Sequence, residues 1–275
     1  MRLKKMKKKM PKIIAVNLKK GGVGKSVVVR LLADYLAQDA KVCLVDGDES
    51  ANTTNRTKID RSNNEQAELE NLFRKRDLKP VNIQPNLDLV LGSASLEQVN
   101  AELAGKFNNT IMFLSHLRNK STFDDYDYIV IDTRNDTNII TNNMLVDSDV
   151  VLGVCDTCGD SYDAWMNLVD HMQDLRESVV DGMTEKSYVH AKVKFIGNKV
   201  SPKTNVSTQF KEVIKDDSDC FGYIENRTCF DEAILLRTSV LDYMMKKRNQ
   251  DESYKKFVAN TLALLENIKQ SLDEE

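Results

Sequence analysis

The stretch Lys20-Gly21-Gly22-Val23-Gly24-Lys25-Ser26 lies between the apolar run Ile13–Val16 and an amphipathic stretch over residues 25–38. A phosphate chain needs a backbone that can approach it closely, and glycines allow this because they carry no Cβ. The amides of such a loop and the start of the next helix then point at the phosphates. We therefore predict a P-loop. Its nucleotide-binding residues would be Gly21, Gly22, Val23, Gly24, Lys25, Ser26 and Val27.

Apolar runs and helical stretches alternate along the rest of the chain. The runs are short and continuous, which is typical of strands in a parallel sheet that is covered on both faces. This pattern predicts a doubly wound α/β fold with a mostly parallel sheet. Further strands are expected at Val42–Val45, Leu87–Leu91, Tyr128–Ile131, Val150–Val154, Val193–Ile196 and Phe221–Ile224, and helices near 64–77, 95–117, 161–178, 205–216 and 251–272. No repeat or linker divides it, so we expect a basic arm at 1–11 and one P-loop ATPase domain at 12–275.

Carboxylates follow two of the expected strands. Asp46 and Asp48 end the run around residue 45, and Asp132 ends Tyr128–Ile131. Strand-end carboxylates beside a P-loop can bind Mg²⁺ and orient a water molecule. Lys25 is expected to reach the β- and γ-phosphates, and the Ser26 hydroxyl to complete the Mg²⁺ shell.

The glycine-rich stretch resembles the deviant Walker A motif, KGGVGK[ST], of the ParA/MinD group of ATPases. The resemblance implies that Lys20 reaches across a homodimer to the partner's nucleotide and that the cofactors are ATP and Mg²⁺. It also implies that Asp48 positions the attacking water, and that Ser26, Asp46 and Asp132 form the metal site. Lys20, Lys25 and Asp48 would then be the catalytic residues.

Other positions match this family less closely. Glu49-Ser50 replaces a Pro-Gln pair, and Arg134-Asn135-Asp136 stands where one or two prolines are usual, in the segment that senses the γ-phosphate. Asn198 follows Val193–Ile196 and resembles the family's adenine-binding Asn, although a strand-end cap is an alternative. Cys155 and Cys158 have metal-ligand or redox spacing, but we expect two buried thiols at a strand end.

The charge of the chain is unevenly distributed. The net charge is −3, yet residues 2–12 carry seven basic side chains and no acidic one. Such an arm is either a solvated tail or an electrostatic contact to DNA. The candidate DNA contacts are Lys4, Lys5, Lys7, Lys8 and Lys9.

Within this family the chain is most similar to short-form ParA proteins. That resemblance implies a slow ATPase that binds DNA without sequence preference and is stimulated by a ParB-like, centromere-binding partner. It implies a cytoplasmic, nucleoid-associated protein. The acidic end Leu272-Asp273-Glu274-Glu275 disfavours the membrane helix of MinD-like proteins, and no run reaches the roughly 18 apolar residues of a membrane span. A MinD-like positioning ATPase and a metabolic ligase of the dethiobiotin-synthetase type remain alternatives.

Overall fold

The computed structural model describes residues 10–201, 203–247 and 251–274. In these ranges eight strands form one sheet in the order β3-β4-β2-β5-β1-β6-β7-β8. All neighbouring pairs are parallel except β3 with β4. The strands are β1 (Lys12–Val16), β2 (Val42–Gly47), β3 (Val81–Gln84), β4 (Leu87–Val90), β5 (Tyr128–Thr133), β6 (Val150–Cys155), β7 (Lys192–Val200) and β8 (Cys220–Glu225). The predicted fold class is confirmed.

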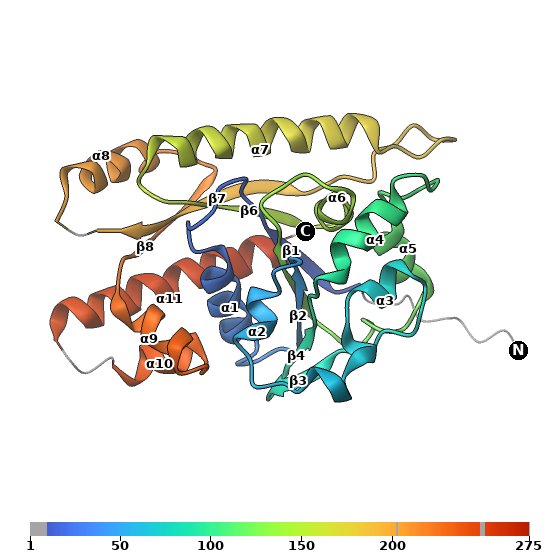
Figure 1. Ribbon diagram of the computed structural model, residues 1–275. Helices are drawn as coiled ribbons and strands as arrows, with labels where there is room; N and C mark the ends of the chain where they lie inside the picture. The colour runs from blue at the N-terminus through green and yellow to red at the C-terminus, as the bar shows by residue number, and fades with distance from the viewer. Residues whose placement is uncertain (1–9, 202, 248–250, 275) are drawn as a thin grey trace, which may run out of the picture.

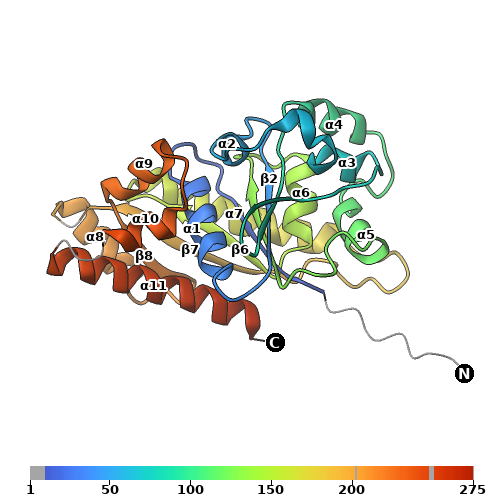
Figure 2. The ribbon, with the colours of Figure 1, turned by 90° about the horizontal axis from the view of Figure 1, so that it is seen from below.

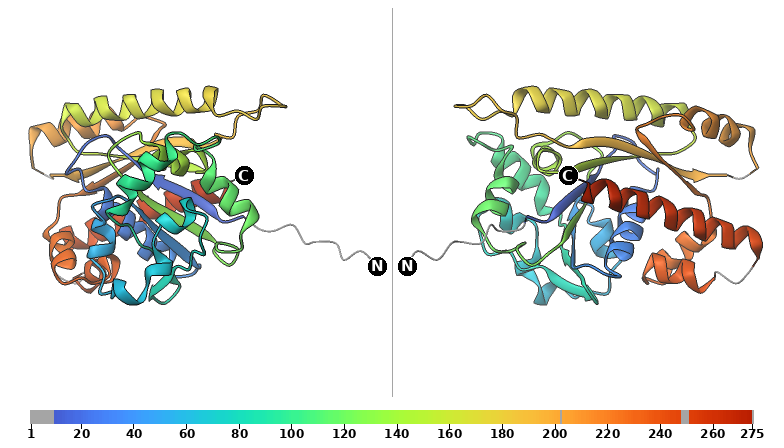
Figure 3. Two further views of the ribbon diagram at one scale, coloured as in Figure 1. Left: turned by 45° about the vertical axis from the view of Figure 1, so that its right-hand side comes forward. Right: turned by 180° about the vertical axis from the view of Figure 1, so that it is seen from behind.

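Helices cover both faces of this sheet (Figure 1). Figure 3 shows α7 and α11 on opposite sides of it, and α1 lies on the same side as α11. The α-helices are α1 (Lys25–Leu36), α2 (Asn52–Asn55), α3 (Glu70–Phe73), α4 (Ser95–Leu103), α5 (Met112–Asn119), α6 (Ile139–Val146), α7 (Gly159–Ser178), α8 (Asn205–Ile214), α9 (Thr228–Leu235), α10 (Val240–Lys246) and α11 (Glu252–Asp273).

The central strands form the core because they are apolar along their whole length. Every residue of β2, β5 and β6 is buried, and β1 lies between β5 and β6. Each fully buried Val, Leu or Ile side chain stabilises the fold by about 1.5–3 kcal/mol. Since β1 is central, the P-loop that follows it lies in the middle of the carboxyl edge.

Two predicted helices differ from the structure. The stretch 64–77 contains a 3₁₀ turn at Glu65–Ala67 and only the four-residue α3, because Glu68 between them is extended and bridges to Leu91. The stretch 95–117 is divided into α4 and α5 around Asn108, which has the left-handed φ of 57°. Sequence reasoning also missed β3, whose residues are half-buried or exposed, and the helices α2, α6, α9 and α10.

Among the described helices, none is both long enough and apolar enough to cross a membrane. The candidate DNA contacts Lys4, Lys5, Lys7, Lys8 and Lys9 lie outside the described residues.

Candidate functional site

The P-loop connects β1 to α1, as the sequence predicts. Gly22 and Gly24 have left-handed φ values of 77° and 92°, and Gly24 is the N-cap of α1. A Cβ on Gly24 would lie 2.3 Å from Nδ2 of Asn198. Glycine is therefore required at residue 24 both by backbone conformation and by the neighbouring strand.

The ammonium group of Lys25 lies inside this loop, and the residue is 8% exposed. It donates to the carbonyl oxygens of Leu18 at 3.2 Å and Lys20 at 3.1 Å, and to Oδ1 of Asn135. Burial lowers the pKa of Lys25, against the opposing effect of Asp132 and Asp48. The amide of Asn135 thus holds the cation that sequence reasoning assigns to the phosphates.

Two predicted metal ligands lie side by side at the ends of adjacent strands. Asp46 and Asp132 are register partners in β2 and β5, and they are 0% and 2% exposed. Burial, followed by the charge of Asp132, raises the pKa of Asp46 to about 7. Burial also raises the pKa of Asp132, although hydrogen bonds from Thr53 and Ser26 oppose it.

Helix α2 supplies donors to both carboxylates. Oδ2 of Asp46 accepts from the amide and the hydroxyl of Thr54, each at 2.7 Å. The Thr53 hydroxyl donates to Oδ2 of Asp132 at 2.6 Å. Ser26 also reaches Asp132, so the three predicted metal residues form one cluster of oxygen atoms, the donor type that Mg²⁺ prefers.

This oxygen cluster fits Mg²⁺ in chemistry. In the part of the chain that the structure describes, no three His, Cys, Asp or Glu side chains are grouped to hold a metal ion. The cluster contains two carboxylates and one hydroxyl, so the remaining ligands would have to come from water and phosphate oxygens, as is usual for Mg²⁺.

The two loops that depart from the family pattern contact each other. Glu49 directly follows the candidate water-positioning residue Asp48, and its carboxylate forms an ion pair with Arg134 in the β5–α6 loop. Arg134 also contacts Asp136 at 3.2 Å. Asp48 accepts a hydrogen bond from the amide of Ser50 at 2.8 Å. The loops after β2 and β5 are thus joined at the candidate site.

Lys20 lies at the edge of the P-loop, and its ammonium is 3.3 Å from the Asp156 carboxylate after β6. Burial alone would lower the pKa of Lys20, but its interactions with Asp156 and Cys158 outweigh this effect, and the pKa is raised. The lysine is therefore charged and engaged within its own chain. Its role across a dimer stays a prediction.

Residues of β7 hold the P-loop from the other side. Nδ2 of Asn198 donates to the carbonyl of Val23 at 2.7 Å, and Nζ of Lys199 donates to that of Gly22 at 2.8 Å. Asn198 thus fixes the loop, and adenine binding by this residue stays a prediction.

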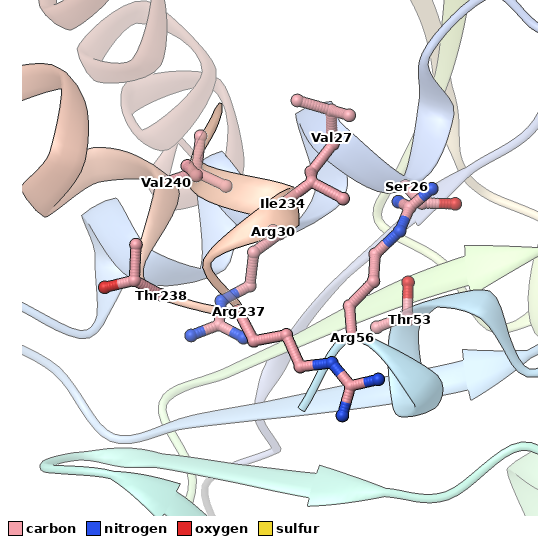
Figure 4. A pocket seen from close by; sticks show the side chains of 10 residues that line it. Ser26, Val27, Arg30, Thr53, Arg56, Ile234, Arg237, Thr238 and Val240 are labelled. Carbon is pink, nitrogen blue, oxygen red and sulfur yellow. The ribbon is translucent and has the colours of Figure 1, made fainter. Parts of the chain in front are cut away.

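A pocket with three arginines opens beside Ser26 (Figure 4). Its volume is about 20 Å³, room for about one water molecule, and it lies between α1, α2 and the α9–α10 segment. Arg30 is bound to Asp34 at 2.8 Å, whereas Arg56 and Arg237 have no ion pair within the described ranges. The pocket therefore places two arginines without an ion pair among the described residues beside the P-loop. Sequence reasoning missed it because its three arginines come from segments far apart in the chain.

The two cysteines with metal-ligand spacing do not form a pair of buried thiols. Cys155 is buried at the end of β6, but Cys158 is exposed at the N-cap of α7, so this prediction is wrong for Cys158. The chain turns away from the sheet after β6, and only the first cysteine stays in the core.

This chain is similar in sequence to known proteins. Residues 11–184 match a family model described as an AAA domain. The sporulation initiation inhibitor protein Soj of Bacillus subtilis is 32% identical over 148 residues, which are 52% of this chain and 57% of Soj. The matched region thus spans a little over half the length of this curated relative.

Solved structures share the fold over nearly the whole chain. A putative plasmid partition protein from Borrelia burgdorferi B31, bound to AMPPNP, has a TM-score of 0.75 and 22% identity, with 94% of this chain and 99% of that one covered. A complex of Cyanothece McdA with ATP has a TM-score of 0.74 and 16% identity, with 97% and 98% covered. At these identities the likeness establishes the fold alone. Because the family model matches more than half of the 275 residues, the chain belongs to this AAA domain family, as a P-loop protein of the ParA/MinD type.

Proposed function

We propose that this chain is an ATP-dependent DNA partition ATPase. Its site would bind ATP with Mg²⁺, ATP binding would drive a homodimer that binds DNA without sequence preference, and a ParB-like partner would stimulate hydrolysis. The observation that carries the proposal is the meeting of Lys25, Ser26, Asp46 and Asp132 at one edge of the sheet. Similarity to Soj and to a putative plasmid partition protein supports partition over the other roles of this fold.

Each residue of the site has a role in hydrolysis. Lys25 exchanges Asn135 for phosphate oxygens, and the Gly21–Gly24 amides cradle the same group. Ser26, Asp46 and Asp132 would hold Mg²⁺, which neutralises charge that develops on the phosphates. Asp48, partly exposed at the loop surface, orients the attacking water.

Lys20 provides the test of the dimer. For Lys20 to reach a second subunit, it must leave Asp156, and nucleotide phosphates compensate for that lost ion pair. In sedimentation experiments we expect ATP, but not ADP, to convert monomer to dimer when hydrolysis is blocked by Asp48→Ala. Adding Lys20→Ala should return this protein to monomer.

The adjacent Lys19 supplies a matched control, because it is exposed and carries the same charge. Lys19→Ala should leave the ATP-dependent dimer intact. Equal masses in ATP and ADP, or equal effects of the Lys19 and Lys20 changes, would refute the dimer mechanism. Turnover that requires a small carboxylate co-substrate would instead favour a metabolic ligase, and recruitment to anionic vesicles would favour a MinD-like role.

A further inference from the structure

A basic groove lies between the end of α3, the α4–α5 connection and α5. Its volume is about 490 Å³, and none of its lining residues belongs to the P-loop or to the strand-end carboxylates. Figure 2 shows α3, α4 and α5 together at one end of the molecule, away from α8. We call this feature the α3–α5 groove. It is therefore a surface separate from the nucleotide site.

The charged residues that line this groove are all basic. Lys75, Lys106 and Lys120 line it, and no acidic residue is found among its described lining residues. Lys75 and Lys106 are exposed and form no ion pair within the described ranges. The nearby acid Glu102 pairs with Arg74 at 3.1 Å, and its charge also acts on Lys106. The groove thus presents positive charge in a chain whose net charge is −3.

An aromatic side chain stands among these lysines. Phe107 is 99% exposed, which is the highest exposure among the large hydrophobic side chains of the described residues. It is followed by Asn108, whose left-handed φ of 57° turns the chain before α5. Single exposed apolar residues are common, but an aromatic ring between cationic side chains is the combination that binds nucleic-acid backbone together with a base or sugar.

The first strand begins beside the end of the connection between α5 and β5. Lys120 lies at the start of the α5–β5 connection, and Asp127 at its end accepts a hydrogen bond from the amide of Lys12 at 2.9 Å. Lys12 is the last of the seven basic residues at positions 2–12. Lys12, at the start of β1, thus lies beside the segment that leads from α5 to β5.

We propose that the α3–α5 groove is a DNA-binding site. Lys75, Lys106 and Lys120 contact phosphates, and Phe107 packs against a base or sugar. The proposal rests on the proposed partition function, and it names the surface that holds the DNA. It predicts DNA contacts away from α8, which lies at the opposite end of the molecule.

The test measures binding of the full-length protein, with ATP and Mg²⁺, to a duplex of about 40 base pairs of random sequence at several salt concentrations. Each lysine–phosphate contact contributes about 0.9 to the slope of log K against log[salt]. The double variant Lys75→Glu/Lys106→Glu should therefore reduce that slope by about 1.8 and weaken binding at least about tenfold at moderate salt. ATPase activity without DNA should stay at the wild-type value.

A matched control changes the same charge elsewhere. Lys186 and Lys256 are exposed and lie outside the groove, so Lys186→Glu/Lys256→Glu should keep the wild-type slope. Phe107→Ala should weaken binding with an unchanged slope, because it removes an uncharged contact. The charge-reversed variant could fail to fold for reasons unrelated to DNA. The neutral pair Lys75→Gln/Lys106→Gln covers that case and should show the same change of slope.

The possible failures are distinguishable. If wild type binds DNA and the groove variants match the control, the groove is not the site, although the partition function stands. If wild type binds no DNA in any nucleotide state, the proposed function itself fails. If an acidic polypeptide such as polyglutamate binds the groove in a lysine-dependent way and DNA does not, the ligand class is wrong.

Discussion

Two junctions at the carboxyl edge of the sheet are built in different ways. The β1–α1 junction and the β5–α6 junction follow neighbouring parallel strands, and both face the candidate nucleotide site. The first is shaped by left-handed glycines and by contacts within a few residues, such as Lys25 to the carbonyl of Lys20. The second depends on side chains that reach distant segments, such as Arg134 to Glu49 and Asn135 to Lys25.

The comparison shows which parts of a site are specified locally. A P-loop needs its glycines and lysine at fixed spacing, so one substitution there cannot be compensated from elsewhere. The β5–α6 junction joins residues 85 and 110 positions apart in the chain. A contact of this kind can be broken from either side and restored by changing the partner. Experiments can separate the two kinds of junction by this property.

Lys25→Ala should have the largest effect. It removes the cation of the locally specified junction, and no other described side chain reaches the same loop carbonyls. We expect ATP hydrolysis to fall by about 10²–10³-fold or more. Phosphate release measures this loss, and Lys19→Ala, which removes an exposed neighbour, should keep wild-type turnover. Substantial turnover by Lys25→Ala would mean that the loop is not the phosphate site.

Asp48→Ala should lower kcat strongly but leave nucleotide affinity nearly unchanged. Asp48 lies directly after β2 and would orient the attacking water rather than bind phosphate. We therefore expect kcat to fall by about 10²-fold. Single-turnover hydrolysis and titration with a fluorescent ATP analogue separate the two quantities. The exposed carboxylate Asp163 on α7 gives a control variant, Asp163→Ala, that should match wild type. Equal loss of affinity and kcat would place Asp48 in the binding shell instead.

The Arg134–Glu49 ion pair should respond differently to mutation, because exchanging the two charges preserves the attraction between the side chains. Arg134→Glu and Glu49→Arg should each reduce kcat by about three- to tenfold, since each places like charges opposite one another beside Asp48. The double variant Arg134→Glu/Glu49→Arg restores opposite charges and should recover most of the activity. A double-mutant cycle on kcat measures the coupling. If the two effects simply add, the pair does not position the Asp48 loop.

The same contrast explains what the sequence could predict. The fold class, the positions of the long strands along the chain and the residues of the P-loop follow from local periodicity and spacing. The structure brings Lys25, Ser26, Asp46 and Asp132 together at one edge of the sheet. The departures at Glu49 and Arg134 were visible in the sequence, but their contact was not, because no local pattern links residues 85 positions apart. Short elements such as α2 and β3 were also not predicted, since four residues are too few to show a helical or strand period in hydrophobicity.

Asn135→Ala should have the smallest effect. The informative result is whether the affinity for nucleotide rises or falls. Asn135 accepts a hydrogen bond from Lys25, so an arriving phosphate must displace it. A hydrogen bond of this kind contributes roughly 0.5–1.5 kcal/mol, which corresponds to about two- to tenfold in affinity. If Asn135 only competes for Lys25, the variant should bind ADP and ATP more tightly by the same factor. If Asn135 instead donates to the γ-phosphate, ATP alone should bind more weakly. Calorimetric titration with both nucleotides distinguishes these outcomes, and Asn119→Ala at the exposed end of α5 serves as the control.

Unchanged affinity for both nucleotides would show that the contact between Asn135 and Lys25 has no energetic consequence. The β5–α6 junction would then act through Arg134 alone.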